Sequence, residues 1–193
     1  MTARGYSLIE LVFATSLSVT AAAAAVPQIL TTLDEYRAAG AARYLAARMQ
    51  RTRMEAIVRS TEVAIQIVQD ASGYAFTAYV DGNRNGIRSR DIQRGVDASL
   101  GATERLPDQF QGVDFGAIPG LPAVDPGGTP PGSDPIRLGS GNLASFSAAG
   151  TSSSGSLYVR GGRGIQYVIR IFGETGKVRV LKFDSRAQQW RPQ

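Results

Sequence analysis

Hydrophobic and polar positions change their spacing along this chain of 193 residues. From residue 6 to residue 33 nearly every position is apolar or small, and Glu10 is the one charged residue of that stretch. A helix needs about 20 apolar residues to cross the core of a bilayer. This segment is long enough, so we expect a transmembrane helix over residues 6–33.

The helical pattern continues after the apolar segment. Large apolar side chains recur at roughly helical spacing, and six arginines mostly take other faces. The apolar set is Leu33, Tyr36, Tyr44, Leu45, Met54, Ile57 and Val58, and the arginines are Arg37, Arg43, Arg48, Arg51, Arg53 and Arg59. This predicts an amphipathic helix over 34–60 that packs on a globular head, so that 6–60 forms one helix of about 80 Å. The arginines fit a solvated face; contact with a subunit or with phosphate is the alternative.

After residue 60 the spacing changes to two, which is typical of strands. Alternating apolar positions at 63–67 and 74–80 flank turn residues at 70–73, and this predicts a β-hairpin. Further strands are expected at 146, 157–160, 167–172 and 178–183, with a hairpin turn at 173–176. Residues 116–137 are rich in Pro and Gly and predict a long surface loop. The fold class is therefore α+β: a long N-terminal hydrophobic helix packed on an antiparallel β-sheet head of residues 61–193.

The amino-acid composition excludes several classes of catalytic and metal-binding site. The chain has no His and no Cys, which excludes Ser-His-Asp and Cys-His catalysis, Cys/His zinc sites and disulfides. We expect a protein that is not an enzyme. The net charge is +5, but it is unevenly spread: residues 138–193 carry eight basic and two acidic groups, whereas 95–137 carry two basic and six acidic groups. A basic end suits contact with phosphate.

The apolar segment has three interpretations. It fits a secretory signal peptide cut after the alanine run 21–25, or an ordinary membrane anchor. Both leave Glu10 unexplained, because a carboxylate costs about 2.5–3.5 kcal/mol at the bilayer centre and marks function. Pro27 also needs a reason, because proline removes a helix hydrogen bond and kinks the axis. Arg4 before the segment predicts a cytoplasmic N-terminus.

The third interpretation comes from the run Arg4-Gly5-Tyr6-Ser7-Leu8-Ile9-Glu10-Leu11. It resembles the class III signal of type IV prepilins and type II secretion pseudopilins. The resemblance implies that residues 1–5 are a leader, that a prepilin peptidase cuts between Gly5 and Tyr6, and that Tyr6 is then N-methylated. It also implies that Glu10 guides assembly by pairing with the free N-terminus of a neighbouring subunit, and that Pro27 is the helix-loosening proline. The usual first mature residue is Phe, so Tyr6 is a departure that keeps an aromatic ring.

Two stretches of the head carry a narrower resemblance. Residues 145–159 and 176–180 are similar to the "F-x-P-x-G-T…G-T-L" and "G-R-V-R" segments of GspH/FimT-like minor pseudopilins and minor pilins, with Ala148 for the Pro and Lys177 for the first Arg. This implies a single-pass protein of the bacterial inner membrane with its head in the periplasm. Other pilin or pseudopilin subunits would be its partners near the tip of a pilus or pseudopilus. A membrane-anchored periplasmic binding domain is a weaker interpretation, in which Glu10→Ala changes nothing.

A second function from a different class is DNA binding for natural transformation. Some FimT-like minor pilins bind DNA through a G-R-x-R motif, which Lys177 and Arg179 match with one substitution. The candidate DNA-binding residues are Arg160, Arg163, Lys177 and Arg179, and the candidate base-stacking residues are Tyr158, Tyr167 and Trp190. The alternative is that the basic residues are solvated and the tyrosines belong to the core.

Residues 81–91 match the front of an EF-hand-type loop, with oxygen ligands at positions 1, 3 and 5 and Gly at position 6. The candidate Ca²⁺ ligands are Asp81, Asn83, Asn85 and Asp91. The Glu expected at position 12 is Ile92, and three arginines in the loop oppose a dication. The alternative is a polar turn held by Asx hydrogen bonds, and no other cofactor is expected.

Overall fold

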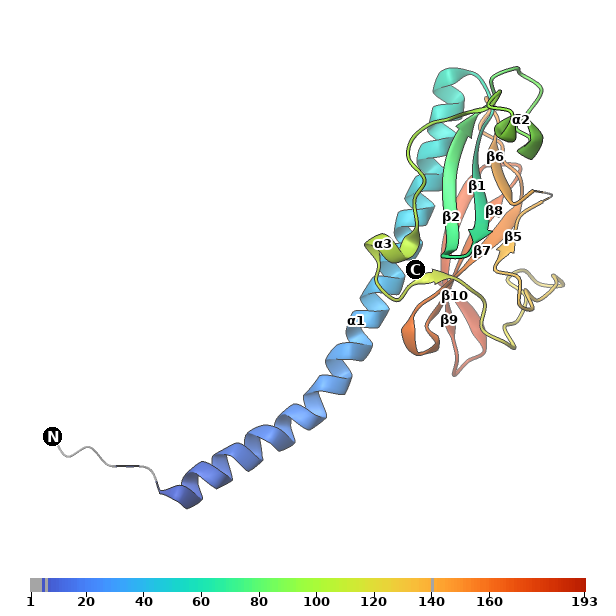
Figure 1. The fold of residues 1–193 in the computed structure, drawn as a ribbon. Coiled ribbons are helices and arrows are strands. Elements are labelled where there is room, and N and C mark those ends of the chain that lie inside the picture. Colours follow the sequence, from blue (N-terminus) through green and yellow to red (C-terminus); the bar gives the residue numbers. More distant parts are fainter. Residues whose placement is uncertain (1–4, 6, 140) are drawn as a thin grey trace.

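The structure is a computed structural model and describes residues 5, 7–139 and 141–193. One long helix, α1 (Leu8–Arg59), leads into a head built mainly from strands (Figure 1). The strands are β1 (Val63–Asp70), β2 (Gly73–Val80), β3 (Ala98–Ser99), β4 (Asp114–Phe115), β5 (Ile136–Arg137), β6 (Leu143–Phe146), β7 (Gly155–Arg160), β8 (Gln166–Phe172), β9 (Lys177–Asp184) and β10 (Gln189–Pro192). The connections contain the short helices α2 (Ser89–Gln93) and α3 (Leu106–Gln109) and the 3-10 turn η1 (Gly162–Gly164).

Antiparallel pairing arranges the strands in two sheets. One has the order β3-β2-β1-β6 and the other the order β10-β9-β8-β7-β4, with β5 also paired to β7. The hairpin predicted over residues 63–80 is β1–β2, and the one predicted at 173–176 is β8–β9. The α+β class is confirmed: a helix of 52 residues packs against antiparallel sheets.

The head half of α1 meets the sheets mainly through small side chains. Fully buried positions follow one helix face, at intervals of three, four and seven residues: Ala38, Ala42, Leu45, Met49 and Ala56. The prediction that large apolar side chains make this contact is wrong for Tyr36, Met54 and Val58, which are 73 %, 56 % and 77 % exposed. Alanines let the helix approach the sheets closely, so the bulkier side chains are left on the outer side.

The sheet that contains β7, β8 and β9 is covered on both faces. On the side away from α1, the loop of residues 116–137 lies over it and contributes to a second apolar cluster of Leu121, Tyr158, Val168 and Phe183. The buried side chain of Gln166 holds this loop: its amide donates to the carbonyl of Gly116 at 3.0 Å and accepts from the N–H of Ile118 at 3.1 Å. The expected surface loop is therefore partly buried.

The strands of this sheet run between two ends of the head, and each end is identified by the part of α1 that it contacts. At one end, a Cβ on Gly161, just after β7, would lie 2.8 Å from the Cβ of Ala38, so this turn touches α1 where the helix leaves the head. At the other end, the Arg53 side chain donates to the carbonyl of Gly150 at 2.8 Å and leaves no room for a Cβ on Gly176. We call these the proximal and distal ends of the head.

Candidate functional site

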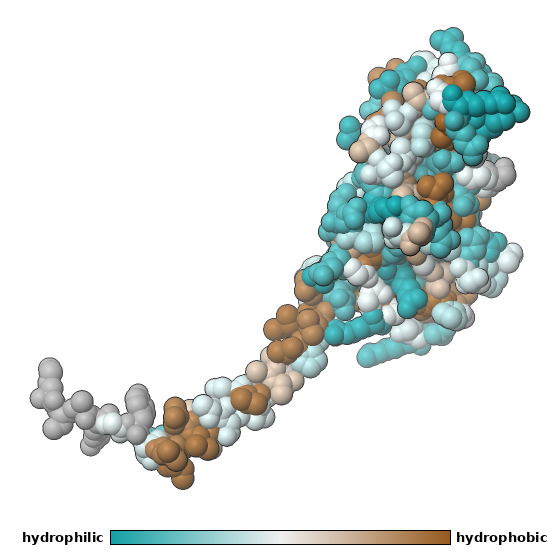
Figure 2. Space-filling view, viewed as in Figure 1, coloured by the Kyte–Doolittle hydropathy of each residue, from teal (hydrophilic) through white to brown (hydrophobic). Residues whose placement is uncertain are grey.

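Within the described chain, the apolar half of α1 meets the head only near its end, where the Thr31 hydroxyl accepts from Arg163. Every described side chain from residue 8 to residue 33 is exposed, including Leu8 at 81 % and Phe13 at 72 %. Figure 2 shows this stretch as a brown and pale rod that leaves a mostly teal head. The helix is long and apolar enough to cross a membrane. An apolar surface of this extent is explained by lipid or by other helices.

Glu10 lies in the first turn of α1, and its carboxylate has a partner within the chain. The Ser7 N–H donates to Glu10 Oε2 at 2.9 Å, as the third residue of a helix does in a capping box. The carboxylate therefore satisfies one of the orphan N–H groups of the helix start. Gly5 is exposed, with nothing within 4 Å of where its Cβ would be. Tyr6, the predicted first mature residue, lies outside the described residues.

Pro27 lies inside α1, and the helix continues through it. Proline has no N–H to donate to the carbonyl four residues earlier, while its own carbonyl accepts from the Thr31 hydroxyl at 2.9 Å. Figure 1 shows that α1 curves along its length instead of breaking. Pro27 therefore lies in the apolar half of α1, and the helix curves there without a break.

Lys177 and Arg179 lie together at the distal end, on the face of β9 that points away from α1. Their neighbours on that face are Phe172 and Arg170 of β8, which pair with them across the ladder. The guanidinium carbons of Arg170 and Arg179 lie 5.4 Å and 5.5 Å from the centre of the Phe172 ring, within cation–π range. We call Arg170, Phe172, Lys177 and Arg179 the distal basic group.

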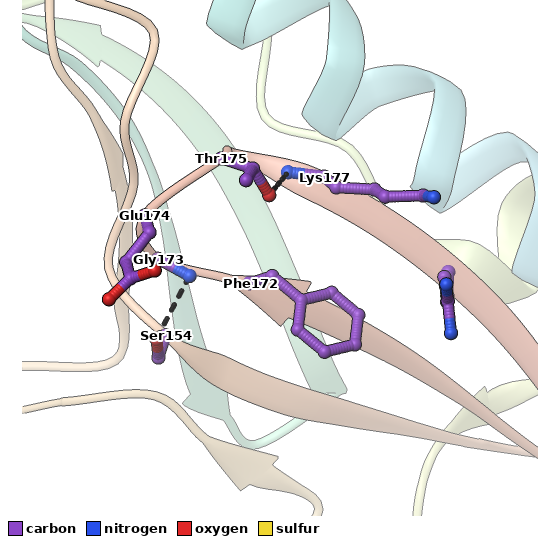
Figure 3. A pocket seen from close by; sticks show the side chains of 7 residues that line it. Ser154, Phe172, Gly173, Glu174, Thr175 and Lys177 are labelled. Carbon is purple, nitrogen blue, oxygen red and sulfur yellow. Dashed lines mark hydrogen bonds between the residues drawn. The ribbon is translucent and has the colours of Figure 1, made fainter.

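A shallow pocket of about 400 Å³ opens beside the distal basic group and is also lined by residues of the β8–β9 turn. In Figure 3 the side chains of Lys177 and Phe172 extend in the same direction from neighbouring strands, away from Ser154 and Glu174. Arg170 is partly neutralised, because it forms an ion pair with Asp125 at 2.6 Å. Lys177 and Arg179 are exposed and can meet an anion. Arg170 and Phe172 were missed from the sequence, although their spacing of two marks one face of a strand.

The other two candidate DNA-binding residues are not part of this group. Arg160 ends β7 and pairs with Gln166, which begins β8, so it lies at the proximal end. Arg163 lies in η1, where its guanidinium donates to the Thr31 hydroxyl at 2.8 Å and approaches Asp34 at 3.6 Å. The strands β7 and β8 therefore separate these two arginines from Lys177 and Arg179. The four candidate residues therefore divide between the two ends of the head.

The candidate base-stacking residues are structural. Tyr158 and Tyr167 are 2 % and 1 % exposed, on opposite faces of the sheet. Burial raises the pKa of both phenols above the ordinary value. Trp190 packs on Phe183 with ring centres 5.3 Å apart and donates to the carbonyl of Pro122 at 3.1 Å. These rings are held in the fold, so the alternative interpretation holds for them.

The loop of residues 81–91 has the geometry of a polar turn. The buried Asp81 carboxylate accepts from the N–H groups of Asn83, Arg84 and Gly86 at 3.2, 2.8 and 2.8 Å. Asn85 donates to Asp91 at 3.5 Å, so the predicted ligands do come together. These three hydrogen bonds use most of the acceptor capacity of the Asp81 carboxylate.

Asp97, which the sequence analysis missed, closes the loop. It is 2 % exposed, and its carboxylate accepts from the N–H groups of Gly82 and Arg88 at 3.1 and 3.3 Å. Asp97 lies outside the D-x-N-x-N-G run, so the motif did not predict that it belongs to this loop. Within the part of the chain that the structure describes, no group of three acidic side chains is placed to hold a metal ion.

Comparisons with known proteins add no family to this geometry. No protein-family model matches the chain, and neither a curated protein nor a solved structure does.

Proposed function

We propose that this chain is a non-catalytic structural subunit of pilin type, a minor pilin or pseudopilin. It is inserted in the bacterial inner membrane by the apolar half of α1, with its head in the periplasm. A prepilin peptidase removes residues 1–5, and the chain then joins other subunits in a type IV pilus or a type II secretion pseudopilus, near the tip. One observation carries the proposal: the apolar half of α1 is exposed on all sides and has a single carboxylate, Glu10, near its start.

The assembly role of Glu10 follows from the cost of a charge in an apolar environment. A carboxylate surrounded by lipid or packed helices needs a strong partner. The hydrogen bond from the Ser7 N–H satisfies part of its capacity, since a carboxylate has about four acceptor sites. An ammonium group from a neighbouring subunit fits the remainder and fixes the register of addition.

The processing step is tested by mass spectrometry of the mature N-terminus in the native membrane. We expect a chain that begins at Tyr6 and carries one N-methyl group. A chain that begins near Val26 would show a secretory signal peptide instead, and an unprocessed chain would show an ordinary anchor. Either result contradicts the proposal.

The role of Glu10 is tested by two variants that separate its charge from its hydrogen bond. Glu10→Gln keeps an acceptor for the Ser7 N–H and removes the charge, whereas Glu10→Ala removes both. We expect both to insert in the membrane and both to be lost from isolated filaments. If Glu10→Gln assembles like the wild type, the residue is a helix cap and no intersubunit partner is needed.

A second candidate function is DNA binding at the distal basic group. It is favoured by the exposed Lys177 and Arg179 on one face, at the end of the head farthest from the apolar helix. For the full chain in detergent, we expect Lys177→Gln with Arg179→Gln to reduce the slope of log K against log salt by about 2, one unit per lost phosphate contact. Arg160→Gln with Arg163→Gln is the matched control, and an equal reduction there would contradict a distal site.

A further inference from the structure

The proximal end of the head carries cationic side chains around the point where α1 leaves it. Arg163 contacts the helix directly: its guanidinium donates to the hydroxyl of Thr31, which lies in the last turns of the apolar segment. Its backbone is left-handed, with φ of 54°, a conformation that is uncommon for residues other than glycine. The turn thus holds a half-exposed cation at the level where the apolar surface of α1 ends.

Two further arginines extend this surface. Arg160 is exposed at the end of β7. Arg186 is exposed in the turn after β9. This turn lies at the end of β9 near Lys182, whose ammonium binds Glu35 of α1. Figure 1 shows the loops of this end as the parts of the head nearest to the departing helix. We call Arg160, Arg163 and Arg186 the proximal collar.

The nearby acidic side chains do not cancel this charge. Asp34, Glu35 and Asp184 each already face a cation: Arg163, Lys182 and Arg191 respectively. Among the described residues, neither the Arg160 nor the Arg186 guanidinium has a carboxylate within 4.0 Å; the backbone N–H of Arg186 donates to Asp184 at 3.0 Å. Asp114 lies opposite Arg160 in the β4–β7 ladder, so it counts with the acids of this end. The five cations, Arg160, Arg163, Lys182, Arg186 and Arg191, then face four acidic side chains, a net side-chain charge of +1.

We propose that the proximal collar binds the phosphate groups of anionic phospholipids while the unassembled subunit is anchored in the membrane. The inference rests on the proposed function, because it requires the apolar half of α1 to lie in a bilayer. In that position the collar lies at the headgroup layer, where long cationic side chains place their charge. DNA would have to enter between the head and the membrane to reach the same side chains, so lipid is the favoured ligand.

The experiment uses the full chain in lipid nanodiscs and a fluorophore on a single introduced cysteine, which is unique because the chain has none. Ser185→Cys reports on the exposed turn at the proximal end, and Thr175→Cys on the exposed turn at the distal end. Energy transfer to an acceptor on lipid headgroups is compared between discs of phosphatidylcholine alone and discs that also contain phosphatidylglycerol.

We expect higher transfer from the Ser185→Cys label in the anionic discs, and loss of this increase at high salt, where the Debye length is short. The triple variant Arg160→Gln, Arg163→Gln, Arg186→Gln should lose the increase as well. Arg186→Gln alone, in an exposed turn, should reduce it without disturbing the core. The matched control Lys177→Gln with Arg179→Gln should keep it, and the Thr175→Cys label should not respond.

Equal transfer in both lipids, or a triple variant that behaves like the wild type, would overturn the inference. It would also be overturned if the triple variant weakened binding of duplex DNA and left the lipid response intact. Co-elution of the chain with the discs separates the two proposals. An inserted chain without a lipid response contradicts this inference alone, whereas a chain that fails to insert contradicts the proposed function as well.

Discussion

The two halves of α1 belong to one continuous helix but meet different surroundings. From residue 8 to residue 33 each described side chain is exposed and most are apolar or small, whereas from 34 to 59 one face is buried against the head. The buried face is built mostly from alanine, and several larger apolar side chains remain outside. The apolar residues of a helix therefore indicate that it packs against an apolar surface, but they do not indicate which face of the helix is covered.

The largest expected effect is on the stability of the head, when a buried leucine of the second half is compared with an exposed leucine of the apolar half. Leu45→Ala removes a fully buried side chain and should lower the free energy of unfolding by about 2–5 kcal/mol. Leu17→Ala removes an exposed one and should leave the unfolding of the head unchanged. Denaturant titration of the full chain in detergent, followed by Trp190 fluorescence, measures both. Equal losses would mean that the halves share one protein core.

Enlarging an alanine tests the close approach of the second half. Ala42 is fully buried, so Ala42→Leu should cost about 1–3 kcal/mol through overpacking against the sheets. Ala22→Leu, at an exposed position, is the matched control. The same titration applies, and a neutral Ala42→Leu would show that the helix has room to move away from the head.

The junction between the halves contains the ion pair of Glu35 and Lys182. The hydrogen bond to Glu35 raises the pKa of Lys182 above its ordinary value of 10.5. A raised lysine pKa gives stability that is fully present below 10.5 and is lost as the pH rises through the folded-state pKa. Glu35→Gln should therefore cost about 0.2–1 kcal/mol at pH 7.

Thermal unfolding as a function of pH measures this contribution. The difference in midpoint between the wild type and Glu35→Gln should shrink as the pH rises above 10.5, the ordinary lysine value. A difference that stays constant over that range would assign the effect to packing.

The smallest effect is expected at the outer side of the second half. Val58 is 77 % exposed, so Val58→Ser should change the free energy of unfolding by less than about 0.5 kcal/mol. A larger loss in the isolated subunit would place Val58 in a contact with the head. A loss that occurs only in filaments would assign this side of the helix to another subunit.

The strand pattern of the head was predictable where side chains alternate. The strands β1, β2, β7, β8 and β9 and both hairpin turns follow the predicted segments. β10, which carries Trp190, and the two-residue strands β3, β4 and β5 were missed, because their alternation is too short to count. Lys177 and Arg179 were correctly placed on one strand, but their distance from Arg160 and Arg163 depended on the antiparallel register.

The long helix, its apolar first half with Glu10 and Pro27, and the longer strands of the head were predictable from residue spacing alone. These features are local, because the spacing of apolar residues and the cost of a charge in lipid act within one segment. Three features became visible only in the folded chain: alanines form the contact face, Asp97 closes the loop of Asp81, and the basic residues divide between two ends of the head. These features depend on contacts between segments that are far apart in the chain. The packing and hydrogen-bond energies of those contacts involve several segments at once, so the pattern within one segment does not reveal them.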